Sequence, residues 1–246
     1  MFCVLRYLRV NKNILILGDG LLGSEIEKQT GWHLISRKKD GLDITKPETF
    51  YKILSQKGAV CKYDVVINTI ACTDTYNAQR DTHWDVNYKG VSDLVEFCNE
   101  SNVKLVHIVT DYIYANSDPG IDESGVPVHC ANWYGYTKLL GDAHVQLKSN
   151  DYLLIRSTHK SRPFKHEYAW ANQAGNFDYV DIIVAKIIKL VEKDASGIFN
   201  VGTEPKTMFE LAQQTKSDVK SEYKLSNSST PTNVVMSTNK LKDFLL

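Results

Sequence analysis

Two residues, Tyr134 and Lys138, have the types and spacing needed to move a proton to or from a carbonyl oxygen. They stand four positions apart in the stretch YGYTKLL, so a helix would place them on one face. A phenol normally titrates near pH ~10, and a neighbouring ammonium lowers that value by stabilising the phenolate. Tyr134 is therefore the candidate general acid, and Lys138 would tune it. Tyr136 is a weaker candidate because the residue four positions on is Leu140.

A glycine-rich stretch, GDGLLG, lies at the start of the chain's first apolar-to-helical transition. In this pattern Gly18 permits a tight turn, Gly20 lets a pyrophosphate approach the backbone, and Gly23 lets the following helix pack closely. Leu22 lies in the first turn of that helix, whose N-terminal N–H groups attract phosphate. A glycine turn without a ligand is the alternative. The position after the apolar run Ile14–Leu17 favours a dinucleotide site.

The residues after the second apolar run indicate which dinucleotide would bind. An NAD site usually presents an acidic residue there for the ribose 2′-hydroxyl. Here the run is Ser36-Arg37-Lys38-Lys39, with no acid before Asp40. Arg37 and Lys38 suit a 2′-phosphate, so NADP(H) is favoured, with NAD(H) as the alternative. A solvated turn would also account for these cations.

Thr110 follows the apolar run Lys104–Val109 and could hydrogen-bond the same carbonyl oxygen as Tyr134. A Thr in this place often serves only as a cap, and a Tyr-x-x-x-Lys pair alone is more often structural. We interpret the two together as a catalytic group because the glycine loop, this strand end and the Tyr–Lys helix would converge at one edge of a sheet.

Short apolar runs alternate with helical stretches along most of the chain. Continuous rather than alternating apolar runs are typical of strands buried on both faces, as in a parallel sheet. The alternation predicts an α/β fold, a Rossmann-type doubly wound parallel sheet. The expected strands are Ile14–Leu17, His33–Ser36, Asp64–Asn68, Lys104–Val109, Tyr152–Arg156 and Ile198–Val201, and the expected helices begin near Leu21 and span Pro47–Lys57, Trp84–Ser101, Trp133–Ser149 and Val180–Lys193.

Two stretches, 158–176 and 203–246, lack this clear alternation. We expect them to form a small C-terminal substrate-binding region within one unit of 246 residues, rather than a separate domain. His107, inside an apolar run, is expected to be a satisfied core residue.

The amino-acid composition limits which kinds of binding partner and which cellular location are expected. Basic and acidic residues number 29 each, so the net charge is zero and nucleic acid is not an expected partner. No apolar run approaches the ~20 residues that span a bilayer, and Arg6 and Arg9 interrupt the apolar opening, so neither a membrane span nor a signal peptide is expected. For the opening ten residues, an extra strand, an interface segment and a misplaced start all remain open.

The five cysteines, without metal-site spacing, indicate reduced thiols, a cytoplasmic location and no metal. A homodimer remains open.

The motifs resemble those of the extended short-chain dehydrogenase/reductase superfamily, and within it the dTDP-4-dehydrorhamnose reductases. The likeness covers about Asn13 to Arg156 and is weak beyond. It is carried by GDGLLG, GLDITKPE, DVVINTIACTDTYNAQRD, WDVNYKG, VTDYIYA, YGYTKLLGD and, later, FDYVDI.

The resemblance implies roles for several residues. Gly18, Gly20 and Gly23 would cradle the pyrophosphate, and Asp43 and Ile44 would lie beside the adenine. Thr69, Ile70 and Ala71 would line the cofactor, and Asn87 would steady the active-site framework. The catalytic group would be Thr110, Tyr134 and Lys138, and Lys138 would also hold the nicotinamide ribose.

The implied activity is NADPH-dependent reduction of the 4-keto group of a nucleotide-activated 6-deoxy sugar, in dTDP-rhamnose or polysaccharide biosynthesis. Related dehydratases carry an acid after the Thr-Asp pair, where this chain has Tyr112, which favours reduction without dehydration. The stretch between Arg156 and Asp178 is shorter than in the family, which leaves the substrate open. Five basic residues there would meet a substrate diphosphate or form a solvated loop: His159, Lys160, Arg162, Lys165 and His166.

Two alternatives stand beside the reductase. One is a nucleotide-sugar epimerase, which would show no net consumption of NADPH. The other is a non-catalytic NADP-binding regulatory subunit on the same fold, against which the retained Thr110, Tyr134 and Lys138 count.

Overall fold

The computed structural model describes residues 12–54, 61–75, 80–115, 117–125, 132–224 and 229–246. The apolar opening, with Cys3, and Cys130 therefore lie outside the described residues. Within them, Cys61 and Cys98 are buried free thiols and Cys72 is a half-buried one. None of the described helices has the length and apolar character to cross a membrane.

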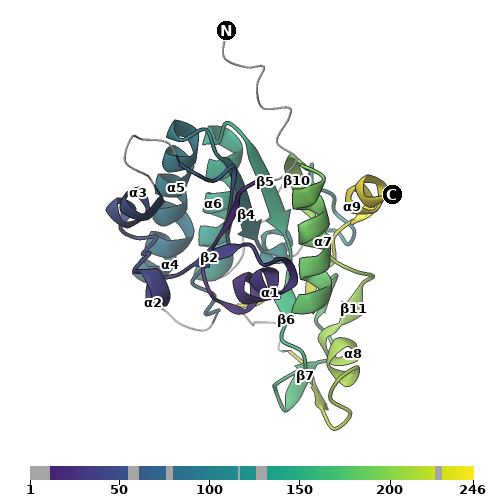
Figure 1. The fold of residues 1–246 in the computed structure, drawn as a ribbon. Helices are drawn as coiled ribbons and strands as arrows, with labels where there is room; N and C mark the ends of the chain where they lie inside the picture. Colours follow the sequence, from purple (N-terminus) through teal and green to yellow (C-terminus); the bar gives the residue numbers. More distant parts are fainter. Residues whose placement is uncertain (1–11, 55–60, 76–79, 116, 126–131, 225–228) are drawn as a thin grey trace.

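The centre of the molecule is a six-stranded parallel sheet, which confirms the predicted fold class (Figure 1). Its order is β10-β5-β4-β3-β1-β2. The strands are β1 (Ile14–Leu17), β2 (His33–Ile35), β3 (Val65–Asn68), β4 (Lys104–Val109), β5 (Tyr152–Arg156) and β10 (Gly197–Asn200). From β1 the chain goes first to β2 on one side and then to β3 on the other. Loops that leave this switch point form the crevice where such sheets bind ligands.

Helices cover both faces of the sheet (Figure 1). On one face lie α3 (Pro47–Leu54), α5 (Gly90–Glu100) and α6 (Trp133–Lys148), and on the other α1 (Leu21–Thr30), α7 (Val180–Glu192) and α9 (Asn239–Leu245). Strand residues point to the two faces in turn: Leu15 and Leu17 pack in one core, and Ile16 in the other. Both faces are buried, which explains why the strands read as unbroken apolar runs.

Three local expectations need correction. The helix expected from Trp84 begins earlier, as α4 (Arg80–Trp84), and passes through a π-helix, η2 (Asp85–Lys89), into α5. The cationic stretch after β2 is a short helix, α2 (Arg37–Asp40), rather than a turn, because the Ser36 side chain caps it by accepting from the Lys39 N–H. The last strand lies at Gly197–Asn200, one residue earlier than expected.

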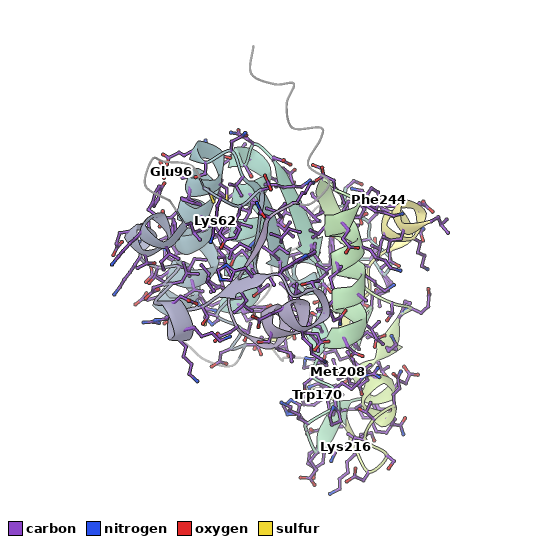
Figure 2. The ribbon with its side chains drawn as sticks, viewed as in Figure 1. Lys62, Glu96, Trp170, Met208, Lys216 and Phe244 are labelled. Carbon is purple, nitrogen blue, oxygen red and sulfur yellow. The ribbon has the colours of Figure 1, made fainter. Side chains whose placement is uncertain are left out.

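The C-terminal lobe comprises the described residues of 161–177 and 203–236, which extend beyond one edge of the sheet (Figure 1). In it β7 (Tyr168–Trp170) pairs with β12 (Lys220–Glu222), and β8 (Ala174–Gly175) lies between β11 (Lys206–Thr207) and β13 (Asn233–Val234). Helix α8 (Met208–Gln213) covers a separate apolar cluster that includes Phe164 and Leu211. Figure 2 shows Met208 and Trp170 at the end of the lobe nearest the sheet, and Lys216 farther away.

The lobe is joined to the sheet at both of its chain segments. The strand pair β6 (His159–Lys160) and β9 (Asp178–Tyr179) connects the first segment to β5 and α7. After the second segment the chain returns to the sheet as α9, whose Leu241 is buried in the same core as α7 and β10. The final residues, although grouped with the substrate region by their sequence, thus pack on the sheet.

Candidate active site

Helix α6 carries both Tyr134 and Lys138 and begins at a cap that also contacts the lobe. Asn132 is the N-cap: its Oδ1 accepts the N–H of Gly135 at 2.7 Å. Its Nδ2 donates to the carbonyl of Ser229 in the lobe at 2.8 Å. One side chain therefore sets where the helix begins and how the lobe lies against it. The Asn before this helical stretch is a cap signal that was available in the sequence but not used.

Lys138 is buried beneath the end of β4. Its Nζ donates to the carbonyl of Ile108 at 2.6 Å. Burial lowers the pKa of Lys138 to about 8, against a smaller opposing effect of Asp142. The ammonium is thus held at a defined place and loses its proton more readily than an exposed lysine.

Thr110 and Asp111 follow β4 directly. The Thr110 hydroxyl caps the 3₁₀ helix η3 (Asp111–Tyr114) by accepting the N–H of Tyr112, at 3.2 Å, so the capping role expected as the alternative is present. Thr158 donates to Asp111 Oδ1 at 2.5 Å. Burial raises the pKa of Asp111 to about 6, although hydrogen bonds from Thr158 and Thr110 and the charge of Lys160 oppose the rise.

Aromatic rings flank Tyr134. Its ring meets the ring of Tyr112 edge to face, with centroids 5.8 Å apart, and that of buried His83 at 6.5 Å. Tyr112 lies on η3 and His83 on α4, so the phenol lies between segments that follow β4 and precede α5. Tyr134, Lys138 and Thr110 are thereby brought to the same edge of the sheet.

Asn87 joins three segments around this edge. Its Oδ1 accepts the N–H of Cys72, and its Nδ2 donates to the carbonyl of Cys72, both at 2.9 Å. The same Nδ2 donates to Thr137 Oγ1 on α6 at 3.2 Å. A Cβ on Gly141 would lie 2.6 Å from the Asn87 carbonyl, so this glycine lets α6 approach η2 closely. Asn87 thus holds the loop after β3 against the catalytic helix.

The three glycines of the β1–α1 loop have different surroundings. Gly18 has φ +101°, and a Cβ on Gly23 would lie 1.9 Å from the Gly18 carbonyl oxygen. The backbone conformation at position 18 and the packing at position 23 therefore require glycine, whether or not a ligand is bound. A Cβ on Gly20 would meet nothing within 4 Å. Helix α1 begins after Gly20 with no side-chain cap and no acid in its first turn. The open space beside Gly20 and the uncapped N–H groups fit a pyrophosphate.

The loop after β3 supports the glycine loop. Thr69 Oγ1 donates to the carbonyl of Leu17 at 2.8 Å, and Ile70 would be 2.9 Å from a Cβ on Gly18. Asn68, buried at the end of β3, accepts the N–H of Ile70 at 3.0 Å. Ala71 is half-buried in the same loop. Thr69, Ile70 and Ala71 therefore follow the switch point, beside the dinucleotide loop.

The residues expected near the adenosine lie at the β2 end of the sheet. Asp43 Oδ2 is 3.3 Å from Arg37 Nη2, and Asp43 Oδ1 accepts the hydroxyl of Thr45 at 2.8 Å. Burial alone would raise the pKa of Asp43, but these contacts together lower it. Arg37 and Lys38 are exposed, whereas Ile44 is buried against Gly90. Arg37 is thus partly neutralised by Asp43.

The five basic residues after β5 do not form one group. Arg162 pairs with Asp181 at 3.3 Å and covers the ring of Tyr179, and Lys165 and His166 are exposed. His159 and Lys160 are half-buried on β6. Burial lowers the pKa of His159 to about 4, and the charge of Lys160 adds to this effect.

His107 is buried as expected but only half satisfied. Its Nδ1 lies 3.2 Å from Asn68 Nδ2, whereas its Nε2 has no hydrogen-bond partner within the described part of the chain. Burial, with the charge of Lys138, lowers its pKa well below the usual range, so the ring is neutral.

A buried ion pair anchors the far part of the catalytic helix. Asp142 on α6 accepts from Arg156 at the end of β5, with Oδ2–Nε at 2.9 Å and Oδ1–Nη2 at 3.0 Å. Arg156 also donates to the hydroxyl of Tyr114 at 2.6 Å, and Tyr114 donates to Asn200 on β10. This network joins α6 to three segments of the sheet. Sequence reasoning missed it because no pattern links residues so far apart.

The parallel sheet, with the glycine loop and the Tyr–Lys helix at one edge, defines a protein with the fold of the extended short-chain dehydrogenase/reductases. The model of the RmlD substrate binding domain family matches residues 12–159, and the chain belongs to this family.

Named relatives agree with this assignment. dTDP-4-dehydrorhamnose reductase of Burkholderia thailandensis is 30% identical over 152 residues, 59% of this chain and 49% of that protein. In that match the chain spans about half the length of its relative. ADP-L-glycero-D-manno-heptose-6-epimerase of Fusobacterium nucleatum is 22% identical over 235 residues, 78% of this chain and 69% of that protein.

Solved structures show the same fold. dTDP-4-dehydrorhamnose reductase of Bacillus anthracis in complex with NADP superposes with a TM-score of 0.81 at 22% identity, covering 94% of this chain and 92% of that one. The enzyme WbmH of Bordetella bronchiseptica in complex with NAD⁺ gives 0.75 at 14% identity, covering 96% and 93%.

Proposed function

We propose that this protein is an NADPH-dependent reductase of the 4-keto group of a nucleotide-linked 6-deoxy sugar. The observation that carries the proposal is the meeting of Tyr134, Lys138 and Thr110 at the sheet edge that also holds the glycine loop. The reductase relatives support the substrate class.

The nicotinamide dinucleotide would be held by the β1–α1 loop, where Gly20 leaves room for a pyrophosphate, and by the loop of Thr69, Ile70 and Ala71. When bound, it supplies the hydride that reduces the carbonyl carbon. Arg37 and Lys38 favour NADPH over NADH because they lie after β2, where a 2′-phosphate would be placed. Arg37 would exchange its contact with Asp43 for the phosphate.

Side chains of the protein would donate the proton that the carbonyl oxygen takes up. Tyr134 donates its phenolic proton to the carbonyl oxygen as the alcohol forms, and Thr110 donates a hydrogen bond to the same oxygen. The Lys138 ammonium stabilises the resulting phenolate. Asn87 keeps the loop after β3 and α6 at a constant separation, so that cofactor and phenol stay aligned.

The test is the loss of NADPH absorbance with enzymatically generated dTDP-4-keto-6-deoxy-L-mannose, compared with Tyr134→Phe. The expected result is stoichiometric oxidation that is lost in the variant. Conversion of a nucleotide sugar without net NADPH loss would support an epimerase instead, a function favoured by the heptose-epimerase relative. NADPH binding without any turnover would overturn the reductase and favour a regulatory subunit in a cytoplasmic complex.

A further inference from the structure

Two lysines, Lys160 and Lys224, lie near enough at the boundary between the sheet and the lobe for the charge of one to act on the other. Lys160 ends β6, and Lys224 follows β12. Lys224 is only 7% exposed, and its Nζ lies 5.3 Å from the centroid of the Trp170 ring. Trp170 ends β7 and pairs with Glu222 of β12. In Figure 2 Trp170 lies at the end of the lobe nearest the sheet.

The two ammonium groups are only partly compensated: the Trp170 ring covers that of Lys224, and the charge of Asp111 acts on that of Lys160. Across the residues that the structure describes, neither Nζ donates a hydrogen bond or forms an ion pair. Burial lowers the pKa of Lys224 to about 8, and the nearby charge of Lys160 adds to this effect. Burial likewise lowers the pKa of Lys160, opposed by the charge of Asp111. Two partly desolvated like charges destabilise a fold unless an anion joins them.

The position of Lys224 is built into the lobe. Asn172 accepts the N–H of Lys224 at 2.8 Å and donates to its carbonyl at 3.0 Å. This double hydrogen bond fixes the backbone from which the side chain starts, and the Trp170 ring covers its ammonium. A lysine buried in this way without a hydrogen-bonding or anionic partner is rare, because removing its charge from water is costly.

The lysine pair adjoins the catalytic residues. Thr158, two positions before Lys160, donates to Asp111, which follows Thr110 directly. The second carboxylate oxygen of Asp111 has no hydrogen-bond partner among the described residues. A ligand whose carbonyl oxygen meets Tyr134 and Thr110 would therefore extend past Asp111 toward the two ammonium groups.

We propose that Lys160 and Lys224 together bind the diphosphate that links nucleoside and sugar in the substrate. The inference rests on the proposed function, since it assigns a part of the same substrate. A diphosphate carries negative charge on both phosphates, and one ammonium from each side of the boundary would meet each of them. The cofactor's pyrophosphate has its own place at the β1–α1 loop. Of the five basic residues after β5, only Lys160 belongs to this pair.

Binding can be measured without turnover. We would saturate the protein with NADP⁺ and titrate dTDP, UDP and ADP by calorimetry, with thymidine and inorganic pyrophosphate as further probes. Lys160→Met and Lys224→Met are each expected to raise the Kd of the tightest nucleoside diphosphate roughly ten- to a hundredfold. NADP⁺ binding should stay unchanged, which reports that the variants fold.

Lys220→Met is the matched control. Lys220 lies on β12, with its Nζ 5.4 Å from the ring of Tyr168, but it is exposed and pairs with Glu167 at 2.7 Å. This variant should bind the nucleoside diphosphate as the parent protein does.

Three results would overturn the proposal: no nucleoside diphosphate binds the NADP⁺ complex, the two lysine variants bind it with an unchanged Kd, or thymidine binds as tightly as dTDP. Pyrophosphate binding that both lysine variants weaken would support the proposal. Lysine-dependent nucleotide binding in a protein that oxidises no NADPH would support the diphosphate site and reject only the reductase reaction.

Discussion

The sheet with its helices and the C-terminal lobe are held together in different ways. The sheet is built from apolar strands whose side chains are buried on both faces, such as Leu105, Val106 and Leu154. The lobe has strands of two or three residues joined by amide side chains: Asn172 to Lys224, Gln173 to the carbonyl of Pro231 and Asn176 to the N–H of Met236. Two large apolar cores hold the sheet and its helices, whereas the lobe combines one small apolar cluster with directed hydrogen bonds.

The difference separates chemistry from selectivity. Tyr134, Lys138 and Thr110, the proposed catalytic residues, all lie on elements that adjoin the buried core of the sheet, so under the proposed function this part of the molecule would set the reaction type. Lys224 and Trp170 belong to the lobe, which has its own small apolar cluster apart from the two cores of the sheet. In this arrangement, the lobe can change its preferred substrate while the catalytic group stays in place.

The largest expected effect comes from breaking the ion pair that ties α6 to the sheet. In Asp142→Ala the buried Arg156 loses its carboxylate partner, and the free energy of unfolding should fall by about 3–5 kcal/mol. Urea unfolding followed by circular dichroism measures this change. The control is Glu204→Gln in the exposed pair with Lys242, which should cost no more than about 1 kcal/mol. Equal effects would show that burial of the pair is unimportant.

The glycine loop offers a second test of how close packing stabilises the sheet and its helices. Gly23→Ala places a methyl group against the Gly18 carbonyl and should cost about 3 kcal/mol of stability. Gly20→Ala meets no protein atom, so it should cost less than about 1 kcal/mol. It should nevertheless weaken NADP⁺ binding, measured by calorimetry, because the methyl group takes the room of the pyrophosphate. An unchanged NADP⁺ affinity in Gly20→Ala would show that the dinucleotide does not bind at this loop.

Asp111, at the boundary of the two regions, predicts a pH effect. Burial raises its pKa to about 6, whereas an unfolded aspartate titrates near ~3.9. The folded protein therefore keeps a proton that the unfolded chain releases, so this contribution to stability is full below pH ~4 and is lost as the pH rises through about 6. It totals about 3 kcal/mol. In Asp111→Asn this decline should be absent from urea unfolding at pH 4, 5, 6 and 7, and parallel curves would contradict it.

The smallest effect concerns one amide in each region. Asn172→Ala removes two hydrogen bonds to Lys224 and should cost about 1–2 kcal/mol. Hydrogen exchange should accelerate in the lobe and stay unchanged in the sheet. Asn99 makes the same kind of double contact in the sheet half, to the carbonyl of Lys148 and the N–H of Asn150. Asn99→Ala should therefore accelerate hydrogen exchange in α5 and α6. If the two variants changed exchange in the same regions, the distinction between the sheet and the lobe would be wrong.

The two regions also differ in how far the sequence predicts them. Runs such as KLVHIV predict their strands because burial on both faces demands apolar residues at every position. Gly18, Gly23, Tyr134 and Lys138 have signals in local spacing. The lobe gives no such signal, since its strands are too short for a period to show and its contacts are distant in the chain. The sequence therefore contained no indication of the buried position of Lys224. The Asp142–Arg156 pair, although it lies in the sheet and its helices, was not predicted either, because no local pattern links its two residues.

Both segments of the lobe leave the sheet and return to it, the first through β6 and β9 and the second between β10 and α9. Each segment is therefore a closed loop whose ends stay anchored when its interior opens. The entropic cost of keeping the ends of such an open loop together grows only slowly with its length. The lobe should then open and close as one cooperative unit while the sheet stays folded, so a nucleotide bound across the boundary would raise the melting temperature of the lobe before that of the whole molecule.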